Sequence, residues 1–216
     1  MENRWIQNQI AIYMTNKKLV EFNDKLKPAP IEYYAHIHAQ GEKVGDGSRP
    51  RSCIGMVLQD YSNGTGEKTV RVMANLSPEF FRYALSRVQL GVEQFEFTED
   101  KIFGQPDDNG MSYVTKVSIK RASVDKNGRP RNYPWCVMVE NGRGVKETTQ
   151  TGDIHMKKGS YVKGPFVFVN ISDYDFFTLM VQTCRYIEAW ELTNGPKRIR
   201  EAKQLIAEQQ AAQTNA

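Results

Sequence analysis

The alternation of hydrophobic and polar residues predicts that the chain is mostly β-structure after residue 30. The expected strands either alternate with a period of two or are short apolar runs bounded by turn residues. They are 31–39, 52–60, 68–76, 112–124, 133–141 and 165–171. The segment 142–164 is expected to add one more strand and a hairpin tip.

Two of the predicted helices each follow directly on a strand. The sequence "ANLSPEFFRYAL" at 74–85 has a counterpart in "VNISDYDFFTLM" at 169–180. Ser77 and Ser172 are expected to cap the helices, and Pro78 suits a first helical position because its φ is already set. Both helices then carry an apolar stripe that can lie on a sheet.

The two strand-to-helix corners align at a constant offset of 95 residues. The matched pairs are Val72 with Val167, Asn75 with Asn170, Leu76 with Ile171, Ser77 with Ser172, Phe81 with Phe176 and Leu85 with Met180. Because several strands precede each corner, the pattern indicates an internal repeat. Chance is the alternative, since capping Ser and helical Phe are both common.

The two ends of the chain are predicted to be helical. Apolar residues in 2–26, among them Trp5, Ile10 and Phe22, are spaced more like helical turns than like a strand. The "KPAP" at 27–30 ends that segment. Near the other end, "ELTNGP" predicts a helix stop before a helical or frayed tail.

Together these patterns predict an α+β protein. Two antiparallel β-sheet-plus-helix repeats are expected to pack as a pseudo-dimer. The expected parts are an N-terminal helical segment at 1–30, the first repeat at 31–91, an acidic connector at 92–110, the second repeat at 111–190 and a helical or disordered tail at 191–216.

Composition excludes several classes of protein. The 216 residues are 40% hydrophobic, and no apolar run approaches the roughly 20 residues that cross a bilayer. The N-terminus lacks the layout of a signal peptide, so a cytoplasmic location is expected, in the host cytoplasm if the protein is viral. Cys53, Cys136 and Cys184 form no CxxC, and we expect free thiols.

Charge is unevenly distributed. Residues 111–163 hold eleven Lys/Arg against four acids, a net charge of +7, whereas 92–108 hold six acids and one lysine. A basic sheet favours a polyanionic partner, and a solvated charged surface is the alternative.

Aromatic residues alternate with the cations of the second half, which is the combination that single-stranded nucleic acid requires. Phosphate contacts are expected from Lys116, Lys120, Arg121, Arg129, Arg131, Arg143 and Lys146. Base stacking is expected from Tyr113, Tyr133 and Trp135, with Tyr33 or Tyr61 as further candidates. The alternative for each ring is ordinary packing between strands.

The strongest catalytic candidate is "HIHAQGE", in which His36 and His38 could share a metal on one strand face, with Glu42 following. This spacing resembles the first half of the cupin metal motif. The second cupin motif has no counterpart, because "GPFVFVN" contains no His. We therefore expect no metal, no cofactor and no enzymatic activity.

The sequences "TVRVMANLSPEFFRYAL" and "PFVFVNISDYDFFTLM" resemble the last strand and helix opening of a family of single-stranded nucleic-acid binders. It includes Pur-alpha, Whirly, the transcriptional positive cofactor four and related phage proteins. The resemblance is topological and spans about residues 31–190. It implies sheets that bind single strands through basic and aromatic side chains, without metal or nucleotide.

The resulting hypothesis is binding of single-stranded DNA with little sequence preference, as an accessory protein of replication or recombination. The resemblance to phage proteins is consistent with a viral origin. RNA as the ligand and a homo-oligomeric state stay open, and no membrane partner is expected. The alternatives are a protein-interaction or assembly module and, less favoured, a cupin-like metal enzyme using His36 and His38.

Overall fold

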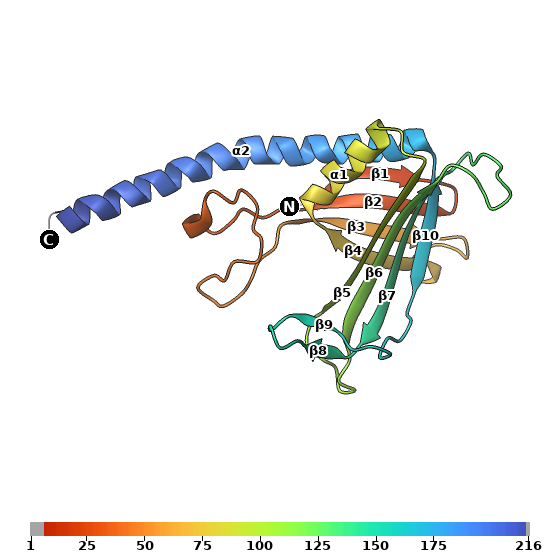
Figure 1. The fold of residues 1–216 in the computed structure, drawn as a ribbon, viewed down its shortest axis with the longest axis horizontal. Coiled ribbons are helices and arrows are strands. Elements are labelled where there is room, and N and C mark those ends of the chain that lie inside the picture. Colours follow the sequence, from red (N-terminus) through yellow and green to blue (C-terminus); the bar gives the residue numbers. More distant parts are fainter. Residues whose placement is uncertain (1–6, 215–216) are drawn as a thin grey trace, which may run out of the picture.

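A computed structural model describes residues 7–214, which form two four-stranded antiparallel sheets and two α-helices (Figure 1). The first sheet has the order β1-β2-β3-β4 and consists of β1 (Gln9–Met14), β2 (Lys18–Lys25), β3 (Cys53–Asp60) and β4 (Val70–Leu76). The second has the order β10-β7-β6-β5 and consists of β5 (Gln94–Phe103), β6 (Ser112–Ala122), β7 (Trp135–Gly144) and β10 (Phe166–Ile171).

The remaining elements are short, apart from the two helices. They are α1 (Pro78–Gln89), α2 (Asp173–Thr214), the hairpin of β8 (Lys146–Thr148) and β9 (Ile154–Met156), and the 3-10 turns η1 (Ile31–Tyr33) and η2 (Gly66–Lys68). The α+β class, the two antiparallel sheets and the C-terminal helix are therefore confirmed. Within residues 7–214, no helix is long and apolar enough to cross a membrane.

Both predicted strand-to-helix corners are present. The Ser77 hydroxyl accepts a hydrogen bond from the backbone N–H of Phe80 at 3.3 Å, and the Ser172 hydroxyl accepts one from Asp175 at 3.1 Å. Each cap satisfies a backbone donor that the first helical turn leaves without an intrahelical partner. The strand that precedes each corner, β4 or β10, is an edge strand of its sheet.

One hydrophobic core joins the two sheets and the two helices. The fully buried rings are Phe22 on β2, Phe81 on α1, Trp135 on β7 and Phe176 on α2. We call the sheet faces that contribute to this core the inner faces. Because both inner faces and both helices share the core, the division into separate repeat domains stays a prediction.

The predicted N-terminal helix is wrong. Residues 9–25 form β1 and β2, and Phe22 pairs with Met56 of β3 across the sheet. Val20 and Phe22 are buried together on the inner face, so pairing with β3 outweighs the helix-like spacing. Trp5, which contributed to that prediction, lies outside the described residues.

The expected strand at 31–39 and the acidic connector are also corrected. The former holds only η1 and an isolated bridge between Pro28 and His38, and its loop packs on α2. The connector contains β5, whose Phe95 and Phe97 turn to the core while Glu96 turns away. The acidic residues conceal this alternation because they occupy the solvent-facing positions.

The helix stop predicted at "ELTNGP" is wrong as well, since α2 continues through Gly195 and Pro196. The segment before β3 supports this turn of the helix. Ile37 approaches Gly195, the Arg198 guanidinium donates to the carbonyl of Ala29, and His38 stacks on Trp190 with ring centroids 4.8 Å apart. These contacts hold α2 together where proline removes a backbone donor.

Replacing the proline tests this account. Pro196 is exposed, and Pro196→Ala restores a helical N–H, so we expect the free energy of unfolding to rise by up to about 3 kcal/mol. Urea denaturation followed by circular dichroism measures the change, with the exposed Leu192→Ala as the control. A loss of stability would show that α2 requires the proline geometry.

Candidate nucleic-acid interface

The second sheet separates the ten predicted binding residues into four places. Arg121 and Trp135 lie at the core, and Lys116 and Lys120 lie on the outer face. Arg129, Arg131 and Tyr133 lie in the exposed loop between β6 and β7. Tyr113 and Arg143 lie at the far end of the sheet, and Lys146 lies just beyond it at the start of β8. The charge that is contiguous in sequence is therefore divided between surfaces.

Trp135 does not offer its ring to a ligand in this structure. It is 0% exposed, it stacks on Phe176 with ring centroids 3.8 Å apart, and its indole N–H donates to Asp173 at 2.7 Å. Arg121 bonds the same carboxylate through two nitrogens, each at 2.9 Å. Both residues fasten the start of α2 to the sheet, so we no longer assign them to the binding surface.

Lys116 and Lys120 share the outer face with acids of β5. Lys120 Nζ lies 2.7 Å from the Glu96 carboxylate, and Lys116 Nζ lies 3.5 Å from that of Asp100. Lys116 also lies over the ring of Tyr161 at 4.0 Å, beneath the chain segment that follows β9. Lys120 is half-exposed and open to a ligand, whereas Lys116 is largely covered.

The open edge of β4 crosses the inner face of the second sheet. The Asn141 side chain accepts from the N–H of Met73 at 2.8 Å and donates to the carbonyl of the same residue at 2.8 Å. Lys101 donates to the carbonyl of Asn75 at 2.8 Å. On one side of this crossing lies the core. On the other side of the crossing, the inner face of the second sheet is exposed. There it lies next to the outer face of the first sheet.

Two aromatic rings lie beyond the crossing. Tyr113 is 51% exposed and Phe103 is 50% exposed, and the rings are stacked with centroids 6.1 Å apart. The Arg143 guanidinium lies 3.7 Å from the centroid of Tyr113. Lys146 reaches the same end of the sheet and donates to the carbonyl of Gly104.

The first sheet adds cations on its outer face. Lys25 extends over Gly55 and donates to the Asn75 side chain at 3.0 Å, while Arg71 is exposed on β4. Burial raises the pKa of the Cys53 thiol, and the charges of Lys25, Lys101 and Lys27 act in the opposite direction. Cations from both sheets therefore gather around Cys53.

We call this region the corner surface. It comprises Lys25, Arg71, Met73, Lys101, Phe103, Tyr113, Arg143 and Lys146. Two acids accompany it: Glu99 lies 2.8 Å from Lys101, and Asp107 lies 3.5 Å from Arg143. The arrangement can receive an extended anionic chain that carries flat apolar groups.

Sequence reasoning missed Phe103 and Lys101. Both lie in the acidic segment that was predicted as a connector. The alternation in "QFEFTEDKIF" is the signal that would have found them, because it places Phe103 on the same strand face as Phe95 and Phe97.

The histidines do not form the shared site that the cupin-like alternative requires. His36 is bonded to Glu42 at 3.0 Å, whereas His38 is bonded to Ser52 and to Glu191, each at 2.8 Å. The two rings have different partners on a loop, not on one strand face. Across residues 7–214, no group of three or more His, Cys, Asp or Glu is placed to hold a metal ion.

Comparisons with known proteins find similarity among solved structures alone. No family model and no curated protein matches the chain. Among solved structures, the chain is similar to that of "the plant transcriptional regulator PBF-2", with a TM-score of 0.43 and 10% identity, over 89% of this chain and 93% of that one. This match identifies neither a ligand nor a binding residue of the chain.

Trp135→Phe separates a core role from a binding role. The variant loses the hydrogen bond to Asp173 but keeps an aromatic ring in the core. We expect the free energy of unfolding to fall by about 1–2 kcal/mol and the affinity for oligonucleotides to stay within twofold. Chemical denaturation and fluorescence anisotropy measure the two effects, and a large loss of affinity in a folded variant would restore Trp135 to the interface.

The same cluster predicts a dependence of stability on pH. Hydrogen bonding to Arg121, and then to Trp135, holds the pKa of Asp173 below its ordinary value, although partial burial opposes this. The ionised carboxylate therefore stabilises the fold above the pKa of the unfolded chain, and this contribution is lost as pH falls through the lower pKa of the folded state.

Asp173→Asn should reduce stability at pH 7 and flatten its decline in acid. Urea midpoints measured from pH 7 to pH 3 would show this, with Asp108→Asn, in the loop before β6, as the control. An acid-induced decline equal to that of the unmodified protein would contradict the role given to Asp173.

Proposed function

We propose that the chain binds single-stranded DNA at the corner surface, with little sequence preference. The observation that supports this best is the pair of stacked, half-exposed rings of Phe103 and Tyr113, with the Arg143 guanidinium 3.7 Å from one of them. Rings and cations at one place meet the two needs of an unpaired strand.

The rings favour a single strand over a duplex. A base that stacks on an exposed side chain must first leave its neighbours, which unpaired bases do readily and paired bases do not. Each such contact contributes about 1–3 kcal/mol and is nearly independent of base identity. Low sequence preference follows, because every base has a flat face that can stack on a ring.

The cations of the corner surface would contact phosphates. They are Lys25, Arg71, Lys101, Arg143 and Lys146, and the Arg143 guanidinium lies over the ring of Tyr113. Two are paired with Glu99 and Asp107, but exposed ion pairs contribute less than about 1 kcal/mol. A phosphate can therefore replace either carboxylate, and counterions released from the DNA favour the exchange.

A protein that coats unpaired DNA in this way would serve replication or recombination as an accessory factor, and we propose that role on the binding chemistry alone. The alternative is a protein-interaction module. It is favoured by the distal part of α2, which extends beyond both sheets and exposes Leu205 and Ile206 (Figure 1). The two functions differ in whether the isolated protein binds an oligonucleotide.

Fluorescence anisotropy of a labelled oligo(dT) tests the proposal. We expect tight binding at low salt that weakens as salt rises, and much weaker binding to duplex of the same length. Tyr113→Ala should weaken binding about 5-fold to 150-fold, which corresponds to one lost stacking contact. Arg143→Ala should also reduce the salt dependence by about one ion.

The matched control is Tyr174→Ala, which removes a more exposed aromatic ring at the start of α2, away from the corner surface. It should leave the affinity unchanged. Absence of oligonucleotide binding at low salt would refute the proposal and leave the interaction module as the better account.

A further inference from the structure

The second sheet carries another exposed aromatic pair, on its outer face. Phe166 and Phe168 alternate along the edge strand β10, and they are 55% and 40% exposed. Their register places them beside Glu140 and Met138 of β7, on the face that turns away from the core. Adjacent exposed apolar rings that are rimmed by polar residues are typical of an interaction surface.

Three cations from three separate elements lie on this side of the second sheet, and one of them contacts a ring. Lys18 of β2 reaches around the edge of β10, where its Nζ lies 4.0 Å from the centroid of Phe168 and 3.0 Å from the carbonyl of the same residue. Lys120 lies on β6, and Arg131 lies in the loop that follows it. Lys120 pairs with Cys136 across β6 and β7, and the charges of all three cations oppose the rise in the pKa of the Cys136 thiol that burial causes.

We call this region the outer patch, comprising Lys18, Lys120, Arg131, Met138, Phe166 and Phe168. Its acids are Glu96, 2.7 Å from Lys120, and Asp60, 3.2 Å from Lys18. The patch has the same ingredients as the corner surface: two exposed rings, a cation over one of them, and further cations in surface ion pairs that a phosphate can displace.

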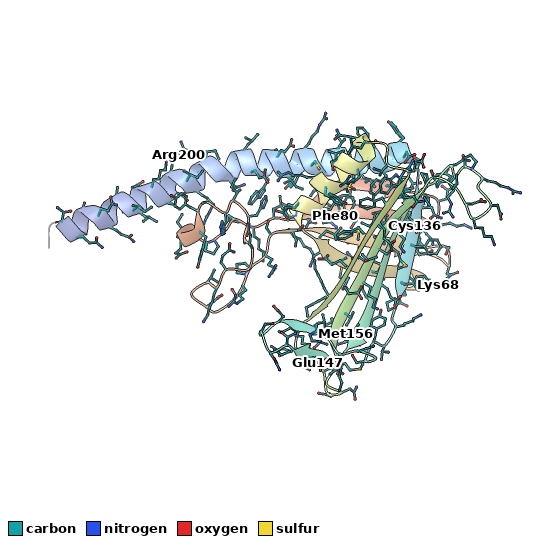
Figure 2. All side chains as sticks on the ribbon, in the orientation of Figure 1. Lys68, Phe80, Cys136, Glu147, Met156 and Arg200 are labelled. Carbon is teal, nitrogen blue, oxygen red and sulfur yellow. The ribbon has the colours of Figure 1, made fainter. Side chains whose placement is uncertain are left out.

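The two surfaces lie on opposite faces and at opposite ends of one sheet. Tyr113 and Lys120 are seven residues apart on β6, an odd spacing that turns them to opposite faces, about 23 Å apart along the strand. Figure 2 labels Cys136, next to the outer patch, and Met156, near the corner surface, at the two ends of this sheet. A short oligonucleotide therefore cannot occupy both surfaces at once.

We propose that the outer patch is a second site for single-stranded DNA, so that one chain holds two strands and promotes their annealing. This rests on the proposed function of the corner surface. The positive charge and the flat rings select an unpaired polyanion as the occupant. Holding two strands on one protein raises their effective concentration toward the millimolar range, which speeds the meeting of complementary strands.

Native mass spectrometry with dT8 counts the strands that each chain holds and reports the oligomeric state in the same spectrum. We expect two strands per chain for the unmodified protein. The double variant Phe166→Ala/Phe168→Ala should hold one strand per chain, with the oligomeric state unchanged. Tyr113→Ala should also lose one strand, because it weakens the other site.

Annealing supplies the functional readout. Complementary oligonucleotides that carry a donor and an acceptor dye should anneal on the order of tenfold more slowly with Phe166→Ala/Phe168→Ala than with the unmodified protein. The affinity of the variant for its first strand should stay within twofold, because the corner surface has more cations and is occupied first. Leu192→Ala, an exposed apolar change on α2, should match the unmodified protein in both assays.

Each contrary outcome has a distinct meaning. One strand per chain in the unmodified protein, or two strands in the outer-patch variant, would overturn the second site and leave the proposed function in place. Absence of any bound strand would overturn both. Loss of all binding in the outer-patch variant, with Tyr113→Ala unaffected, would leave a single site on the outer face and refute the two-site account.

Discussion

The arrangement of the surfaces depends on how the open edge of β4 meets the second sheet. The Asn141 side-chain amide takes the place of a neighbouring strand. Its oxygen accepts from the N–H of Met73 and its nitrogen donates to the carbonyl of Met73, each at 2.8 Å. Lys101 takes up the next free carbonyl, that of Asn75. An edge strand that lacked such partners would be open to pairing with another chain. These contacts lie at the edge of the hydrophobic core, and Phe103 and Tyr113 are exposed beyond them.

Much of the fold could be predicted from local chemistry. The corners at Ser77 and Ser172 are determined by neighbours along the chain, namely a capping hydroxyl followed by an apolar helical stripe. The segments that were mispredicted depend on distant partners instead. β2 forms because Phe22 meets Met56, and α2 passes Pro196 because residues 29–38 pack against it. Such contacts leave no periodic signal in the sequence.

The interface was harder to predict than the fold because a strand places alternate residues on opposite faces. The excess of positive charge in 111–163 indicated a polyanion, but the register divides that charge among the core, two surfaces and a loop. Trp135 and Arg121 have the residue types of a binding site, yet they bond Asp173 at the start of α2. Phe103 was concealed among acids. Residue type alone could not distinguish these cases, whereas the pairing of strands does.

Photo-crosslinking tests most directly where an unpaired strand lies. An oligo(dT) that contains 4-thiothymidine would be bound to the full chain, irradiated and digested, and the modified residues identified by mass spectrometry. The account predicts modified peptides of β5 and β6 that contain Phe103 or Tyr113, and their loss at high salt. Crosslinks confined to α2 or to residues 27–52, with none on these strands, would contradict it.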